Sequence, residues 1–141
     1  MKHYAQNYGD FFQTLTKEHT QEHYENFFDV NSTFEDPFQK VQGTDAIYKV
    51  FANMYKTLYE PQFKVSEVMQ QGLVAYLKWD FTFRLSPNDV QHSFEGVSRV
   101  EFGEDAKVLS HVDYWDAAFN VYEKIPLVGG LLRLIKRRLH A

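Results

Sequence analysis

The hydrophobic residues in the N-terminal part of the chain recur at helical spacing. A first stripe predicts an amphipathic helix of about four turns; it consists of Tyr4, Tyr8, Phe11, Phe12 and Leu15. Thr20 is a candidate N-cap for a second, shorter helix, which would bury Tyr24, Phe27 and Phe28 and end within residues 29–32. Thr44 can cap a third helix that ends at Glu60-Pro61; its stripe is Ile47, Val50, Phe51, Met54 and Leu58.

The stretch Ser32–Phe38, between the second and third helices, predicts a strand, with residues 39–43 as a connection. In an extended chain, Phe34, Asp36 and Phe38 share one face, and Pro37 favours extended geometry at Asp36. A carboxylate between two phenyl rings loses solvation, and such a position suits a general acid or base. Alternatively, Asp36-Pro37 only begins a turn in which Asp36 binds its own backbone. The stretch by itself favours the turn.

From Phe63 onward the hydrophobic period changes to two, which is typical of strands. The runs are residues 63–70, 73–85, 90–102 and 106–116, separated by short segments that contain Gly72, Pro87 and Gly103. In the second run Ala75, Leu77, Trp79, Phe81 and Phe83 alternate with polar residues, so one face should be covered and the other solvated. Helices followed by an antiparallel meander indicate an α+β domain with the helices on one face of the sheet.

The composition describes a single domain with a substantial core. A chain of 141 residues buries roughly two-thirds of its unfolded surface, and 13 Phe, 9 Tyr and 2 Trp supply bulk for a core and for the walls of an apolar pocket. The absence of cysteine excludes disulfides, thiolate metal sites and a cysteine nucleophile. The N-terminus lacks the apolar segment of a signal peptide, and no run approaches the roughly 18 apolar residues of a membrane span. We therefore expect a soluble cytoplasmic protein.

Charge is divided unevenly along the chain. Residues 121–141 carry a charge of +4 and the whole chain carries −4, so the first 120 residues sum to −8. An acidic body argues against nucleic acid as a partner. The tail, residues 121–141, places Leu131, Leu132, Ile135 and Leu139 beside basic residues, which predicts a basic amphipathic helix. Such a helix can contact an anionic membrane surface, but packing on its own acidic domain or on a dimer mate is the simpler interpretation.

The order of these elements resembles the nuclear transport factor 2-like (NTF2-like) superfamily, in particular its SnoaL-like polyketide cyclase and ketosteroid isomerase-like branch. The resemblance covers about residues 4–120; its most specific portions are Phe28–Phe38 with Glu35-Asp36-Pro37-Phe38, Gly43–Ile47, and the strand that ends in Tyr114-Trp115. It implies a cone-shaped α+β fold, in which three N-terminal helices pack on a strongly curved antiparallel sheet around a deep apolar pocket. It also implies a domain boundary near residue 120, with the tail as a separate unit.

The resemblance gives Asp36 the position of the carboxylate that moves a proton in ketosteroid isomerases. Counting without gaps, the oxyanion tyrosine of those enzymes corresponds to Phe12, and their protonated acid corresponds to Ser98. Phe12 has no phenol hydroxyl and Ser98 has no carboxylic acid, so both strong donors are missing. Losing one oxyanion donor typically lowers the rate by about 10²-fold or more. Authentic steroid isomerisation is therefore not expected, and Asp36 could be a relic.

The last strand offers a second set of ionisable groups. Leu109, His111, Asp113 and Trp115 occupy one face, and Val108, Ser110, Val112 and Tyr114 occupy the other. Alternation alone would bury the second face because it is the more apolar, whereas the resemblance implies that His111, Asp113 and Trp115 line the pocket. We follow the resemblance, which makes His111 and Asp113 a pair able to share a proton or position a water. The alternative is an ion pair on the outer face.

Two classes of function remain open. The first is an enzyme that acts by proton transfer or water activation on a small apolar, oxygenated ligand, of isomerase, cyclase or hydrolase type. Its catalytic candidates are Asp36, His111 and Asp113, and its ligand-binding candidates are Phe12, Phe34, Phe38, Trp79, Ser98 and Trp115. The second is a noncatalytic ligand-binding or protein-interaction module. We expect no cofactor and no metal, since His3, His19 and His23 lack converging ligands, and we expect a homodimer built on the outer face of the sheet.

Overall fold

The computed structural model describes residues 3–120 and 137–138 of the chain. Its helices are α1 (Tyr4–Gln13), α2 (Gln21–Glu25), α3 (Thr44–Thr57) and the short α4 (Ala117–Asn120). Its strands are β1 (Phe28–Asp36), β2 (Gln39–Gln42), β3 (Tyr59–Gln71), β4 (Val74–Arg84), β5 (His92–Phe102) and β6 (Val108–Tyr114). The tail lies outside the described residues except for Arg137 and Arg138, which are helical and exposed.

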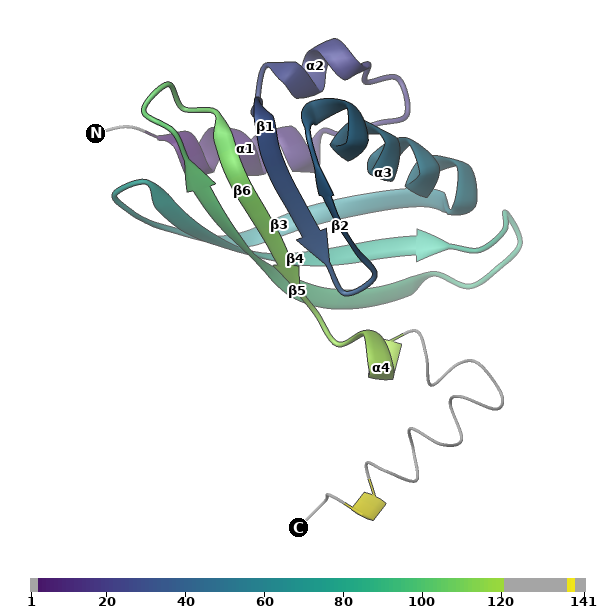
Figure 1. The fold of residues 1–141 in the computed structure, drawn as a ribbon. Helices are drawn as coiled ribbons and strands as arrows, with labels where there is room; N and C mark the ends of the chain where they lie inside the picture. The colour runs from purple at the N-terminus through teal and green to yellow at the C-terminus, as the bar shows by residue number, and fades with distance from the viewer. Residues whose placement is uncertain (1–2, 121–136, 139–141) are drawn as a thin grey trace.

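The strands form one six-stranded sheet in the order β2-β1-β6-β5-β4-β3. The strands β3 to β6 make the predicted antiparallel meander, and the hairpin β1–β2 joins it through a parallel pairing of β1 with β6. The three larger helices lie at the top of the molecule in Figure 1, where α1 packs on β3 and β4, and α3 packs on β1, β2 and β3. The α+β class with helices packed on a mostly antiparallel sheet is confirmed.

Two of the predicted boundaries are wrong around the first hairpin. Phe28 begins β1 instead of ending a helix, and α2 is only 5 residues long. Residues 39–42, expected as a connection, form β2, whose mostly exposed side chains leave no apolar period in the sequence. Thr44 is the first residue of α3, and its hydroxyl donates to the Asp29 carbonyl at 3.1 Å, while Gly43 at φ 96° takes the cap position.

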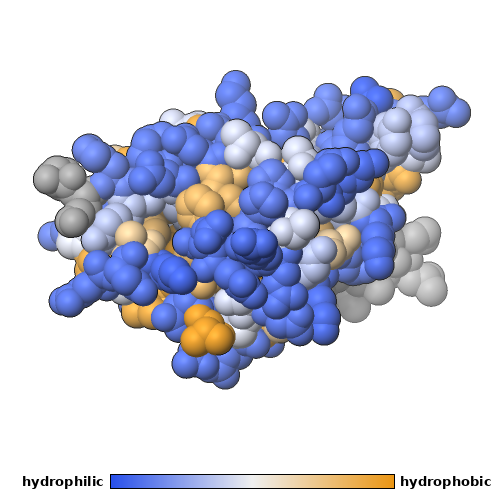
Figure 2. Space-filling view, turned by 90° about the horizontal axis from the view of Figure 1, so that it is seen from above, coloured by the Kyte–Doolittle hydropathy of each residue, from blue (hydrophilic) through white to orange (hydrophobic). Residues whose placement is uncertain are grey.

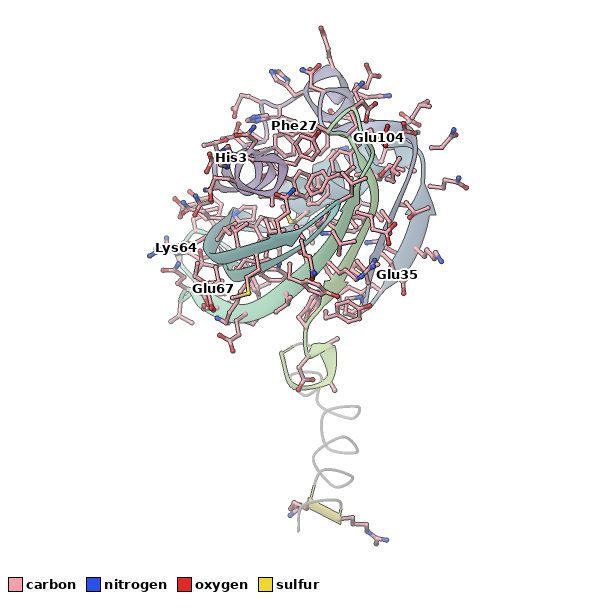
Figure 3. The ribbon with its side chains drawn as sticks, turned by 90° about the vertical axis from the view of Figure 1, so that its left-hand side faces the viewer. His3, Phe27, Glu35, Lys64, Glu67 and Glu104 are labelled. Atoms are coloured by element: carbon pink, nitrogen blue, oxygen red, sulfur yellow. The ribbon has the colours of Figure 1, made fainter. Side chains whose placement is uncertain are left out.

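The core is aromatic and lies between the helices and the inner face of the sheet. The predicted inner face of β4 is confirmed for Ala75, Leu77, Trp79 and Phe81, which are all buried, whereas Phe83 near the end of the strand is only half-buried. Rings from α1, α2, α3 and β1 complete this core: Tyr8, Phe11, Phe12, Tyr24, Phe28, Phe34 and Phe51. Figure 3 shows rings gathered between sheet and helices, while Lys64 and Glu67 of β3 project away from them.

The surface over the helices is mostly hydrophilic, with small hydrophobic areas between polar side chains (Figure 2). On the sheet, Tyr76 and Tyr114 are exposed at 48% and 58%. Among the described residues, no helix is long and apolar enough to cross a membrane.

Candidate functional site

A chain of hydrogen bonds crosses the interior from β4 to α1. The Trp79 Nε1–H donates to Ser98 Oγ at 2.8 Å, and the Ser98 hydroxyl donates to Asp113 Oδ1 at 2.5 Å. The same carboxylate oxygen lies 2.6 Å from His111 Nε2, and His111 Nδ1 lies 2.7 Å from the Tyr8 hydroxyl. Four of the five side chains come from β4, β5, β6 and α1 as core residues that are at most 5% exposed; Asp113 has a side chain that is 12% exposed.

The network has one consistent assignment of donors when His111 is neutral. Asp113 Oδ1 can only accept when ionised, so the imidazole carries its proton on Nε2 and Nδ1 accepts from Tyr8. Burial, followed by the nearby charge of Asp113, raises the pKa of Tyr8 well above its ordinary value. Tyr8 therefore remains a phenol and keeps donating at neutral pH. Every donor in the network then points towards Asp113.

A β-bulge explains why His111 and Asp113 face inward. The pairing of β5 with β6 shifts between Glu101 and Phe102, and one residue of β6 is left over. Val108 is consequently fully buried, and Leu109, which simple alternation groups with His111, is 43% exposed. His111 is 3% exposed, so the alternation argument, which would have turned it outward, fails at this strand.

Gly96 positions the tryptophan end of the network. It lies opposite Trp79 in the pairing of β4 with β5. A Cβ at this position would overlap the Trp79 indole ring. The missing side chain therefore lets the indole lie across β5 and direct its N–H to Ser98.

A small internal cavity of about 20 Å³ touches the network. Its lining includes Tyr8, Ser98, His111 and Asp113, together with the Phe12 ring. This volume is enough for one water molecule, because a buried water needs roughly 10–15 Å³ and two to four polar partners. The site can therefore hold one water beside the Asp113 carboxylate.

A second cavity of about 560 Å³ adjoins the first and is of ligand size. Phenyl and indole rings form much of its wall: Phe34, Phe38, Phe63, Trp79, Phe81, Phe94 and Trp115. Phe38 and Leu85 in this wall are 49% and 63% exposed, so the cavity opens to the surface at that end. Asp113 is the ionisable residue that lines both cavities.

Asp36 also lines the large cavity, but its carboxylate is engaged in the turn between β1 and β2. Its Oδ1 accepts the backbone N–H groups of Phe38 and Gln39 at 2.8 and 3.1 Å, and its Oδ2 accepts from the Gln39 side-chain amide at 3.1 Å. The geometry is that of the turn that the stretch alone favoured. A catalytic role for Asp36 stays a prediction.

The remaining ligand-binding candidates divide between the two cavities. Phe12 and Ser98 border the small one, and Trp79 borders both. In the large cavity, the Trp115 ring stacks on Phe94 with 4.5 Å between centroids and meets Phe38 at 5.3 Å. Phe34 is 2% exposed, and its ring lies 4.9 Å from the His111 ring.

Sequence reasoning missed two members of this region. Tyr8 is one: it precedes Phe12 by one helical turn on the same face of α1. The resemblance expects a tyrosine hydroxyl at the position of Phe12, and α1 carries one a turn earlier, at Tyr8. His92 is the other: its Nε2 lies 2.8 Å from Asp89 Oδ2 at the wall of the large cavity. This hydrogen bond is the main cause that lowers the pKa of Asp89. The three-residue spacing of Asp89 and His92 across a turn was the available clue.

The described part of the chain contains no cluster of three or more His, Asp or Glu side chains arranged to hold a metal ion. The large cavity presents aromatic rings, amides and carboxylates but no lysine or arginine. The arrangement can therefore do two things without further groups: enclose an apolar molecule, and accept a proton from it or from a water at Asp113.

The comparison with protein families identifies residues 8–111 with the SnoaL-like domain. No curated protein sequence matches the chain.

Solved structures share the fold. A protein with a ketosteroid isomerase-like fold from Catenulispora acidiphila DSM 44928, in complex with trimethylamine, is 9% identical, with 90% of this chain and 95% of that chain covered at a TM-score of 0.71. A proposed SnoaL-like polyketide cyclase from Jannaschia sp. CCS1 is 10% identical, with coverages of 94% and 89% and a TM-score of 0.69. A de novo designed protein with a curved β-sheet is 14% identical, with coverages of 95% and 99% and a TM-score of 0.64. At such identities the likeness shows the fold alone, and function must be argued from the site.

Proposed function

Because the chain belongs to the SnoaL-like domain family, we propose that it binds a small apolar, oxygenated molecule in the large cavity and moves a proton through Asp113. The observation that carries this proposal is the position of the carboxylate. Oδ1 takes the hydrogen bonds from Ser98 and His111, and Oδ2 makes no hydrogen bond with any described residue. The free oxygen belongs to the one ionisable side chain that lines both cavities.

Each neighbour of Asp113 has a distinct role in this mechanism. Ser98 and His111 hold the carboxylate in one orientation through Oδ1, which reduces the reorganisation needed when Oδ2 accepts a proton. Tyr8 donates to His111 Nδ1 from the other side of the ring and so helps to hold the imidazole in place. When the proton returns to the ligand or to a water in the small cavity, the carboxylate is restored without displacing a neighbour.

The wall of the large cavity limits the chemistry of the ligand. Among the residues that the structure describes, it carries the carboxylates of Asp36 and Asp113 and no basic side chain except His92. A buried anion would find no lysine or arginine there, so the wall favours neutral or cationic molecules. Aromatic rings also attract alkylammonium ions, and the Catenulispora structure contains trimethylamine.

A noncatalytic binding module is the second candidate function. The specific observation in its favour is that both carboxylate oxygens of Asp36 accept hydrogen bonds within the β1–β2 turn. In addition, Phe12 has no hydroxyl that could donate to a developing oxyanion. In such a module the cavity would bind its ligand, and the network around His111 would only stabilise the fold.

A neutral chromogenic probe for carboxylate bases, 5-nitrobenzisoxazole, separates the two functions. A base that removes the proton on the ring carbon beside nitrogen opens the ring: the N–O bond breaks, a nitrile forms, and the oxygen leaves as a coloured phenoxide. We expect the protein to accelerate this reaction, and Asp113→Asn to lower the rate by about 10²-fold, the lower end of what positioned general bases contribute.

Asp36→Asn is the matched control, because it removes the other carboxylate of the same wall. If Asp36→Asn abolishes the reaction and Asp113→Asn does not, the base is misassigned. If the wild-type protein binds the probe without accelerating its opening, the noncatalytic function is supported instead.

A further inference from the structure

A separate cavity of about 400 Å³ lies on the other side of α3, between this helix, α2 and the loop that connects α1 with α2. It shares no lining residue with the two cavities of the site described above. Its polar lining consists of Thr16, Lys17, Glu18, His19, Tyr24, Tyr48, Tyr55 and Lys56. Two lysines and three phenols therefore converge on a space large enough for a small organic molecule.

Tyr24 is the most unusual member of this lining. The residue is 1% exposed, and its ring is fixed between Phe11 at 5.5 Å and Tyr48 at 5.3 Å. Its hydroxyl forms no hydrogen bond with any described residue and is not among their fully buried unpaired atoms, so it is accessible from the cavity that Tyr24 lines. The contrast is Tyr8, equally buried, whose hydroxyl is bonded to His111. A phenol whose ring is held in place and whose hydroxyl is accessible from a cavity can donate to a molecule bound there.

The two lysines also lack partners. Neither Lys17 nor Lys56 forms an ion pair within 4.0 Å among the described residues, whereas Lys49 on the same helix binds Asp45 at 2.9 Å. The lining includes one carboxylate, Glu18, so its formal charge is still positive. His19 adds a further donor, because its Nδ1 accepts the Thr16 N–H at 3.1 Å and its proton is then on Nε2.

The phenols of Tyr24 and Tyr55 remain donors over the whole physiological range. Burial and the neighbouring Tyr55 and Tyr48 raise the pKa of Tyr24, and burial raises the pKa of Tyr55 to about 12. A protonated phenol is uncharged, so it can donate a hydrogen bond to an oxyanion and does not repel it as a phenolate would.

We propose that this cavity is a second binding site, which takes a small organic molecule carrying a carboxylate or phosphate group. Lys17 and Lys56 neutralise its charge, and the hydroxyls of Tyr24, Tyr48 and Tyr55 donate to its oxygens. Tyr48, Ala52 and Tyr55 share one face of α3. Because the side chain of Ala52 is small, the cavity extends between the two tyrosines, and a larger side chain at this position would fill it. The preference for anions is opposite to that of the large cavity.

Titration calorimetry and backbone amide NMR on the full chain test the proposal with three probes: inorganic phosphate, 4-hydroxybenzoate and its neutral analogue 4-hydroxybenzamide. We expect at least one of the two anions to bind with saturation and to shift the amides of residues 16–19 and 52–56, and the neutral amide to bind at least tenfold more weakly. Phosphate and benzoate together show whether the site prefers a phosphate or a carboxylate. Saturation by neither anion, or equal binding of the neutral analogue, overturns the proposal.

Tyr24→Phe is the decisive variant, because it removes one hydroxyl that has no protein partner. We expect unchanged unfolding and roughly tenfold weaker anion binding, the usual loss for a hydrogen bond to a charged group. Lys17→Gln with Lys56→Gln should weaken binding further, while Lys49→Gln, on α3 but outside the cavity, should not. Anion binding that survives Tyr24→Phe and the double lysine variant unchanged would place the anion elsewhere. These outcomes are independent of the proton-transfer test at Asp113.

Discussion

Replacing Tyr8 by phenylalanine probes the link between α1 and the proposed proton-transfer site. The substitution keeps the ring and its contacts with Phe12 and Phe28, whose centroids lie 4.9 and 5.7 Å away. It removes only the hydroxyl, which lies 2.7 Å from His111 Nδ1. The variant therefore separates the hydrogen bond from the packing.

The expected cost follows from burial. Tyr8 is 1% and His111 is 3% exposed, so bulk water does not reach the acceptor that loses its donor. A buried acceptor left unsatisfied costs about 1–3 kcal/mol in the free energy of unfolding. With an unfolding entropy of about 2.1 cal/mol/K per residue and 141 residues, a loss of about 2 kcal/mol corresponds to a drop of roughly 7 °C in Tm.

Urea and thermal unfolding measure this difference, and Tyr4→Phe is the control. Tyr4 lies on the same helix, and its exposed hydroxyl donates to the Glu104 carbonyl at 3.2 Å, so we expect a change within about 0.5 kcal/mol. In the NMR spectrum the imidazole nitrogens of His111 should show the Nε2–H tautomer in the wild type and also in Tyr8→Phe, because Asp113 Oδ1 still accepts from Nε2 in the variant. Equal stabilities of wild type and Tyr8→Phe, or an Nδ1–H tautomer in the wild type, would refute the proposed donor order around Asp113.

Three other expectations concern different parts of the molecule. Burial raises the pKa of Tyr24, so above about pH 10 the folded protein keeps the phenol proton that the unfolded chain loses, and the free energy of unfolding falls as the pH rises. In urea titrations at several pH values, Tyr24→Phe should make this fall less steep by up to about 1.4 kcal/mol per pH unit. The same slope in wild type and variant would contradict the expectation. Gly96→Ala should displace the Trp79 ring and destabilise the fold by about 1–3 kcal/mol, measured by tryptophan fluorescence and unfolding; an unchanged spectrum with unchanged stability would speak against it. The exposed Tyr76 and Tyr114 favour a homodimer through the outer face of the sheet, so sedimentation at micromolar concentration should show two chains and not a monomer.

The fold was predictable where burial is periodic. β4 alternates between core and surface over its length, so its inner residues could be assigned from the sequence. β2 could not be, because a four-residue edge strand with exposed side chains has no hydrophobic period and is defined only by its pairing with β1. The bulge in β6 is likewise invisible, since it depends on how β5 and β6 are paired and not on either strand alone.

The candidate site was predictable in its residues but not in its connections. His111 and Asp113 could be paired because they lie two apart in one strand, but the resemblance, and not the alternation of the strand, placed them in the pocket. Tyr8 was not, because its hydroxyl meets His111 across 103 residues of sequence, and a tyrosine in an aromatic stripe looks like ordinary core. Asp36 is separate from the network because its carboxylate accepts hydrogen bonds from the β1–β2 turn. The spacing of residues in the sequence does not show which groups a carboxylate binds.

The parallel pairing of β1 with β6 has a consequence for biosynthesis. Phe34 in β1 pairs with His111 in β6, so β1 is synthesised well before the strand that it pairs with in parallel. At roughly 5–20 residues per second, the ribosome needs several seconds to make the intervening chain. During this time the β1–β2 hairpin has an open edge, and the imidazole that Tyr8 will bind does not yet exist. A nascent chain stalled before residue 108 should therefore be a preferred client for chaperones that bind exposed aromatic strands, and one released after residue 114 should not.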